Sequence, residues 1–298
     1  MTFVTRLRRP AVAALTVAAA ALAGLVLTAG PAGAAGAGRY VALGDSYASA
    51  PLVPVQYGQP AGCSRSNRNY PALVAKGLEV ADFRDVSCGG ATTKDMTAAQ
   101  QVPGGRNAPQ LDAVTAAATL VSVTIGGNDI GFGSIIQECA TRSPLKPTGS
   151  ACKDFYNSGG TDQLAARIRA TAPKIADVLE GIADRAPDAK IVVVGYPAIL
   201  PDSGPGCFPI VPFSPGDVAY LRSTEKALNA MLADEAGSAG AVFVDTYTPS
   251  IGHDVCKLPG TKWIEGLVPT SPAAPVHPNA LGTAGQAQAV LDTLGARA

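Results

Sequence analysis

The chain has 298 residues, and its 23 basic and 23 acidic side chains leave no formal net charge. Without the three arginines of the first ten residues, 20 basic side chains stand against 23 acidic ones, a net charge near −3 that argues against a nucleic-acid partner. Charged residues make up 15% of the chain, which is a low share, and hydrophobic residues make up 47%. The roughly 260 residues that follow the first 35 are enough for one α/β domain with a full core.

The first 35 residues have the features of a secretory signal peptide. Arg6, Arg8 and Arg9 precede a long Ala/Leu/Val run that ends in small residues. The run could just span a bilayer, but candidate cleavage sites at 32–34 and 35–37 favour its removal over a stable membrane anchor. We therefore expect a signal peptide at 1–35, one domain at 36–298, and a secreted, extracellular protein.

Five short runs rich in Val and Ile predict strands; in chain order they are RYVALGDS, VADFRDVSC, TLVSVTIGGND, KIVVVGYP and AVFVDTY. Helical patterns lie between several of them and predict helices at 69–76, 161–186, 215–236 and 278–295. Pro173 is expected to kink or split the second of these helices. Strands and helices in this alternation predict an α/β fold with a central parallel sheet.

Long irregular stretches are expected at 48–68, 130–160, 199–214 and 249–276. They contain all the cysteines but one, and an even number of cysteines in a secreted chain predicts disulfides. Of the possible pairings we expect the one in chain order, because each bridge then fastens one loop excursion: Cys63 with Cys88, Cys139 with Cys152, and Cys207 with Cys256. No C-x-x-C or H-x-x-x-H spacing occurs, so no zinc site, other metal or cofactor is implied.

Marked residues end four of the five predicted strands, in the segments GDS (44–46), GGND (126–129), GYP (195–197) and DTY (245–247). The carboxyl ends of parallel strands share one edge of a sheet, and open α/β sheets bind ligands outside that edge. Ser46 and Asn128 are therefore expected to face one pocket. Taken singly, Ser46 could be a helix cap and Asn128 a turn residue.

A serine hydroxyl needs a base to become a nucleophile, and histidine is the usual one. The chain has two histidines. His253 lies close to a cysteine that is expected to be bridged. His277 precedes Pro278, which fits a first helical position, so His277 lies on a loop at the mouth of the last predicted helix and is the better candidate.

With these segments the sequence resembles the GDSL or SGNH hydrolase family, in particular its secreted actinobacterial lipases and esterases. The resemblance rests on ALGDSY, SCGGATT, VTIGGND and VHPNALG, in this order over essentially the whole mature chain. It implies a three-layer α/β/α, flavodoxin-like fold. It also implies that Ser46 is the nucleophile, that His277 is the base, and that Ser46, Gly90 (or Gly89) and Asn128 form the oxyanion hole.

Two departures from the family pattern concern the neighbours of these residues. The family usually has an aspartate three residues before its histidine, where this chain has Ala274. We therefore expect a Ser/His dyad in which a carbonyl of residues 273–275 orients the imidazole, with Asp254 a weaker candidate for a third member. Relatives also often have a glycine shortly after the serine, where this chain has Ala50 and Pro51; Asp45 is expected to stabilise the turn.

The expected substrate is a lipid ester, whether an acylglycerol, a phospholipid or a soluble short-chain ester. The protein is expected to be a monomer with no stable membrane anchor. The apolar loop 203–216 is a candidate acyl-binding trough, or else packs on the core, and 51–58 is a candidate second wall. Trp263 is placed in the core or at the rim. The alternatives are a polysaccharide deacetylase, against which the 5% aromatic content counts, and a non-catalytic secreted binding module.

Overall fold

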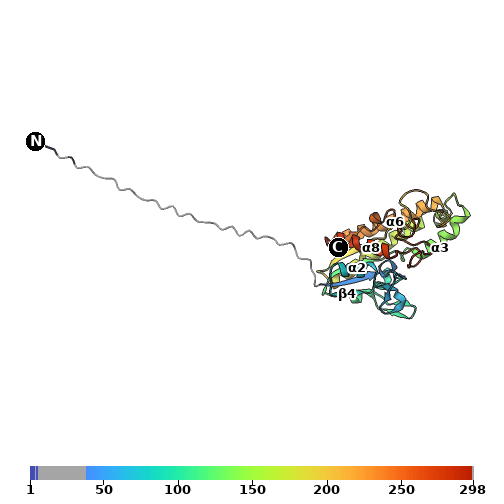
Figure 1. Cartoon of the computed structure of the whole chain (residues 1–298), viewed down its shortest axis with the longest axis horizontal. Helices are drawn as coiled ribbons and strands as arrows, with labels where there is room; N and C mark the ends of the chain where they lie inside the picture. The colour runs from blue at the N-terminus through green and yellow to red at the C-terminus, as the bar shows by residue number, and fades with distance from the viewer. Residues whose placement is uncertain (4, 6–37, 297–298) are drawn as a thin grey trace. The chain divides into compact units, whose positions relative to one another are not determined.

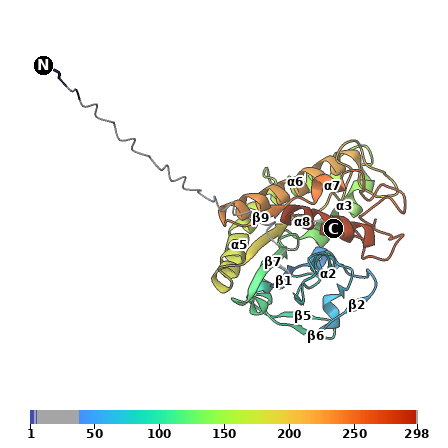
Figure 2. The same ribbon diagram turned by 60° about the vertical axis from the view of Figure 1, so that its left-hand side comes forward.

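The central sheet is parallel and five-stranded, with the order β4-β1-β7-β8-β9. Figure 1 labels its edge strand β4, and Figure 2 labels β1, β7 and β9. The strands of the sheet are β1 (Arg39–Gly44), β4 (Asp82–Asp85), β7 (Ala118–Thr124), β8 (Lys190–Val194) and β9 (Val242–Val244). Each of the five predicted runs supplies one of them. In chain order this is the flavodoxin-like arrangement 2-1-3-4-5, whose switch point, the usual ligand crevice, lies between β1 and β7.

This structure is a computed structural model and describes residues 1–3, 5 and 38–296. Apart from residues 1–3 and 5, the predicted signal peptide at 1–35 lies outside the described residues. The described residues from 38 onward fall within one unit, which spans Ala34–Ala298.

Helices cover both faces of the sheet. On one face α2 (Tyr70–Gly77) packs on α8 (Ala280–Leu294), and on the other α5 (Gln163–Arg185) packs on α6 (Pro215–Ser238). Alternate strand residues divide between the two cores, since Tyr40 and Ala42 face the first pair while Val41 and Leu43 face the second. The fold is therefore the three-layer α/β/α arrangement that the family resemblance implied.

Short elements complete the described chain. They are the helices α1 (Ser46–Ser49), α3 (Phe132–Arg142), α4 (Ala151–Tyr156) and α7 (Tyr247–Ser250), and the antiparallel pairs β2 (Gln56–Tyr57) with β3 (Arg65–Ser66) and β5 (Gln100–Val102) with β6 (Gly105–Asn107). Four 3-10 helices add to these: Ala61–Cys63, Thr93–Met96, Gln110–Ala113 and Ser143–Leu145. Figure 2 shows β2, β5 and β6 together, away from α5 and α6. None of the described helices is long and apolar enough to cross a membrane.

One expectation about local structure was wrong, and of the kink or split expected at Pro173 the split is excluded. The stretch 130–160 contains α3 and α4 and is not a long loop. Pro173 does not split its helix, because α5 continues through it from Gln163 to Arg185. Proline removes one backbone N–H, but the packing of α5 on α6 and on the sheet supplies more free energy than that hydrogen bond.

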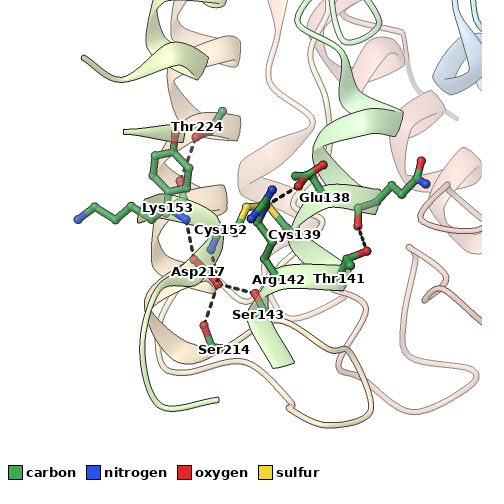
Figure 3. Close-up of a disulfide and its surroundings, with 12 residues drawn as sticks. Glu138, Cys139, Thr141, Arg142, Ser143, Cys152, Lys153, Ser214, Asp217 and Thr224 are labelled. Atoms are coloured by element: carbon green, nitrogen blue, oxygen red, sulfur yellow. Dashed lines mark hydrogen bonds and ion pairs between the residues drawn. A yellow bond between two sulfur atoms is a disulfide. The ribbon is translucent and has the colours of Figure 1, made fainter. Parts of the chain in front are cut away.

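The six cysteines form three disulfides, and the pairing is the one expected: Cys63–Cys88, Cys139–Cys152 and Cys207–Cys256. Figure 3 shows the second of them, between α3 and α4. Beside it, Asp217 at the start of α6 is fully buried and accepts hydrogen bonds from the amides of Cys152 and Lys153 (3.1 and 2.9 Å) and from the hydroxyls of Ser143 and Ser214. The bridge and this carboxylate together fasten α3 and α4 to α6.

Candidate active site

Ser46 follows directly from the carboxyl end of β1. Gly44 ends this strand with a φ of 139°, and a Cβ there would lie 2.4 Å from the carbonyl oxygen of Thr124 on β7, so only glycine fits. Asp45 then caps α1 by accepting a hydrogen bond from the amide of Tyr47 at 2.8 Å. The cap is therefore Asp45, as its expected turn-stabilising role implies, and Ser46 is left in the first helical position.

The Ser46 hydroxyl lies against the imidazole of His277. Nε2 of His277 is 2.7 Å from Oγ of Ser46, and Nδ1 is 2.7 Å from the carbonyl oxygen of Pro275. A carbonyl oxygen only accepts hydrogen bonds, so its contact assigns the proton to Nδ1 and leaves Nε2 as the acceptor for the hydroxyl. This tautomer is the one that a base for Ser46 requires.

Burial changes the acidity of this imidazole. Desolvation lowers the pKa of His277 below its ordinary value of 6.5, and the hydrogen bond to Pro275 opposes that shift only in part. The neutral imidazole is therefore favoured at neutral pH, and in this form Nε2 can take a proton.

Neither Asp254 nor His253 contacts the Ser46–His277 pair. Asp254, the weaker candidate for a third member, is buried and accepts hydrogen bonds near its own loop, from the amide of Cys256 at 2.9 Å. His253 stacks on the indole of Trp263, with ring centroids 4.4 Å apart, and its Nδ1 lies 2.6 Å from the carbonyl of Thr261. Trp263 also lies against α8 at Gly285, so this corner of the fold serves packing.

The loop before His277 has an unusual backbone conformation. Val276 has a φ of 59°, which a β-branched residue seldom adopts. The hydroxyl of Tyr47 donates to the Val276 carbonyl at 2.7 Å, and the Val276 amide donates to the carbonyl of Gly266 at 3.2 Å. These two contacts hold the strained residue, and with it the Pro275 carbonyl, in the position that orients the imidazole.

A buried ion pair fixes the other side of the same loop. Glu265 and Lys262 lie 3.0 Å apart with nearly all their surface buried, and the side-chain amide of Asn279 donates to Glu265 at 2.8 Å. Burial raises the pKa of Glu265, but the hydrogen bonds from Asn279, Thr270 and Lys262 outweigh it and lower this pKa to about 2. Asn279 also caps α8, so the helix start and the His277 loop form one unit.

The predicted oxyanion donors lie together near Ser46. The Gly89 amide is bonded to the Cys63 carbonyl at 2.9 Å, whereas that of Gly90, with a φ of 77°, has no acceptor in the described part of the chain. Gly90 is therefore the better of the two alternatives. The Asn128 side-chain amide donates one hydrogen to the Ala91 carbonyl at 2.9 Å and has a second one for a ligand.

Sequence reasoning missed two tyrosines that support these groups. The hydroxyl of Tyr196 donates to Asp45 at 2.6 Å and accepts from the amide of Gly127 at 2.8 Å, so it joins the ends of β1, β7 and β8. Burial raises the pKa of Asp45 to about 7, although the hydrogen bond from Tyr196 opposes the shift. The ring of Tyr47 lies 5.0 Å from that of His277. The position of Tyr196 at a strand end was the available signal.

A cleft of about 380 Å³ opens over this group of residues. Ser46, Gly90, Asn128 and His277 all line it, together with apolar walls from Pro51, Phe132, Ile136, Leu267 and Val276. The expected wall at 51–58 thus contributes Pro51. The expected trough at 203–216 does not line the cleft, because Val211 and Phe213 are buried in the core instead.

Among the described residues, no group of three or more His, Cys, Asp and Glu side chains could hold a metal ion. The polar groups that line the cleft are the Ser46 hydroxyl, the His277 imidazole, backbone amides and the Asn128 side-chain amide. Such a set can bind an ester carbonyl, stabilise negative charge on its oxygen and move one proton.

Comparison with known proteins agrees with this fold and site. The model of the GDSL-like Lipase/Acylhydrolase family matches residues 42–284. The chain is 42% identical to Lipase 2 of Streptomyces coelicolor, over 97% of each chain. It superposes on the crystal structure of phospholipase A1 from Streptomyces albidoflavus with a TM-score of 0.71, 29% identity and coverage of 88% and 99% of the two chains.

The extracellular lipase of Streptomyces rimosus gives a TM-score of 0.70 at 31% identity, over 87% of this chain and all of that one. The fold and the cleft thus define an SGNH-type hydrolase. The chain belongs to the GDSL-like lipase/acylhydrolase family, and it is a carboxylic ester hydrolase.

Proposed function

We propose that the protein is a secreted lipase or esterase that works through a Ser46/His277 dyad. His277 Nε2 takes the proton from Ser46 as Oγ bonds to the ester carbonyl carbon, and the same proton then goes to the leaving alcohol. In the second step, His277 Nε2 takes a proton from water as the water oxygen bonds to the acyl carbon. The proton then goes to Oγ of Ser46 as the acid leaves. The contact of 2.7 Å between Oγ and Nε2, with Nδ1 on the Pro275 carbonyl, carries this proposal.

The substrate that fits best is a lipid ester. The cleft walls are apolar, with Phe132, Ile136, Leu267 and Val276 facing the space beside Ser46, which suits an acyl chain. Similar proteins named lipase and phospholipase A1 support the same class. The intact contact between Ser46 and His277 favours an enzyme over a binding module.

Two features of the chain support its export from the cell. The sequence of the first 35 residues has the order of a signal peptide, and three disulfides are typical of proteins that fold outside the reducing cytosol. One of the similar structures is described as an extracellular lipase.

Two assays on the oxidised protein test this proposal. The first follows hydrolysis of p-nitrophenyl esters from acetate to palmitate, and the second follows covalent labelling by an organophosphonate, with the site found by mass spectrometry. We expect turnover with a preference for medium or long chains, and one label on Ser46. A protein that neither hydrolyses any ester nor takes the label would be a binding module instead.

The orienting group sets the pH dependence of the reaction. Because the pKa of His277 is lowered, the base stays neutral until the pH falls below about 6.5, and kcat/KM should decline only in that acid range. In Ala274→Asp, a carboxylate at the position where the family usually has one would stabilise the imidazolium and raise this pKa, which moves the acid limb to higher pH. Ala274→Asn is the uncharged control, and equal pH profiles for the two variants would contradict the role given to His277.

Phe132 is expected to limit the acyl chain length. Phe132 and Ile136 line both the cleft and a neighbouring apolar cavity of about 60 Å³ between α3 and α6. Phe132→Ala should open the cavity to the cleft, and each further methylene that enters it should gain roughly fourfold in kcat/KM. The measurement is the ratio of kcat/KM for decanoate over acetate, which cancels any change at His277; Phe155→Ala, remote from the cleft, should leave the ratio unchanged.

A further inference from the structure

Two loops beside the cleft expose large apolar side chains. Leu52 and Val55 follow the nucleophile helix and are 59% and 63% exposed, and Val268 lies in the loop before His277 and is 83% exposed. Leu52 is next to the cleft residue Pro51, and Val268 is next to the cleft residue Leu267. We call Leu52, Val55 and Val268 the apolar rim.

The two loops are fastened to each other. The amide of Ala274 donates to the carbonyl of Pro51 at 3.0 Å, and the buried side chains of Ala50, Val53 and Ala273 form a small core beneath them. The apolar rim therefore stands on one packed support, and its side chains are held out toward water next to the cleft.

The backbone conformation of Leu52 is unfavourable for a side chain that contacts only water. Leu52 has a φ of 65°, a left-handed conformation that costs free energy for a residue other than glycine. Its side chain remains mostly exposed, so burial within the chain does not offset that cost. A bulky residue held in this way at the edge of a cleft points to a contact made outside the chain.

The charges around the apolar rim indicate which surface it fits. No Asp, Glu, Lys or Arg occurs from Tyr47 to Ser64, nor from Gly266 to Leu291, where His277 is the one imidazole. Anionic membranes are recognised by clusters of Lys and Arg, which both segments lack. Apolar side chains on two segments that carry no charged residue match a neutral or zwitterionic lipid surface.

We propose that the apolar rim inserts into the surface of a zwitterionic or neutral lipid aggregate and places the mouth of the cleft on it. This inference rests on the proposed function, since it concerns how a lipid ester reaches Ser46. Each apolar side chain that leaves water fully strengthens partitioning by roughly tenfold. A lipid molecule could then slide from the aggregate past Pro51 and Leu267 into the cleft without crossing water.

The test measures vesicle binding apart from catalysis. The disulfide-bonded protein carrying Ser46→Ala, which leaves the lipid intact, is sedimented with phosphatidylcholine vesicles. Adding Leu52→Asn and Val268→Ser should weaken this binding at least about tenfold; asparagine tolerates the left-handed backbone of Leu52. Leu145→Asn is the matched control, because Leu145 is 76% exposed but lies beside Lys146, and it should bind like the parent.

A second assay separates the apolar-rim proposal from the proposed function. It measures hydrolysis of p-nitrophenyl acetate by the Leu52→Asn/Val268→Ser variant that keeps Ser46. Unchanged turnover of this soluble ester, together with lost vesicle binding, supports the apolar rim. Vesicle binding that survives both substitutions, that is absent in the parent, or that needs anionic lipid overturns it. Absence of turnover in the unsubstituted protein would instead count against the proposed function and leave the binding result to be judged by itself.

Discussion

Replacing Ser46 or His277 by alanine should lower kcat for p-nitrophenyl esters by roughly 10⁴- to 10⁶-fold, with little change in the far-ultraviolet circular dichroism. Without Oγ no acyl-enzyme forms, and without the imidazole the hydroxyl keeps its proton. The residues act as a pair joined by one contact of 2.7 Å, so the double variant should be no slower than either single one. Steady-state and burst-phase kinetics measure these effects.

The chain offers a matched control for each substitution. Ser49 lies three positions after Ser46 on the same helix, and its buried hydroxyl has no hydrogen-bond partner within the described residues, so Ser49→Ala should retain activity. His253→Ala should retain it as well, because that ring stacks on Trp263 away from the cleft. If either control lost as much activity as Ser46→Ala, general damage to the fold would explain the loss and the dyad would be contradicted.

Asn128→Ala should lower kcat by roughly 100- to 1000-fold with a smaller effect on KM. The free hydrogen of its side-chain amide is in a position to stabilise negative charge on the ester oxygen, which develops only in the transition state. The amides of Ser46 and Gly90 remain in the variant, so the reaction should slow without stopping. Single-turnover measurements with the hexanoate ester separate this chemical step from product release.

The control for Asn128→Ala must account for a second hydrogen bond that the Asn128 side chain makes. Its amide also bonds to the carbonyl of Ala91, so its loss could shift the Gly90 loop. Thr93→Val disturbs the same loop differently, because the Thr93 hydroxyl donates to Asp129 at 2.6 Å. Loop movement alone predicts equal losses in the two variants, which would contradict a direct role for Asn128; a much larger loss for Asn128→Ala supports it.

The sequence was sufficient to predict the sheet and the group of residues at its edge, because both depend on local signals. Buried parallel strands are continuous apolar runs, and the polar residues that follow them stand out. Helix α3 was missed because it is short, has only Ile135 and Cys139 as buried residues, and has glycines before its start and in its first turn. Its position depends on the disulfide to Cys152 and on Asp217, which are contacts distant in sequence.

The hydrogen bonds that hold the site residues in place could not be predicted either, because their partners are distant in sequence. Tyr196 meets Asp45 across 151 positions, and Tyr47 meets Val276 across 229, and nothing in the local pattern indicates either partner. The expected carbonyl for His277 lay among three residues, and the conformation of Val276 selects that of Pro275. Ala50 adopts the left-handed conformation (φ 57°), which suits the glycine that the family pattern implies near this position.

The acceptor for Nδ1 of His277 belongs to the main chain, and this has a consequence for how the gene can change. A carboxylate side chain is lost through one codon substitution, whereas the Pro275 carbonyl is present whichever amino acid is encoded there. Point mutations can weaken this support only by reshaping the loop, for example at Tyr47 or Val276. Insertion or deletion of a codon between Glu265 and His277 would displace the carbonyl directly. The length of this segment should therefore change less during evolution than the identity of its residues.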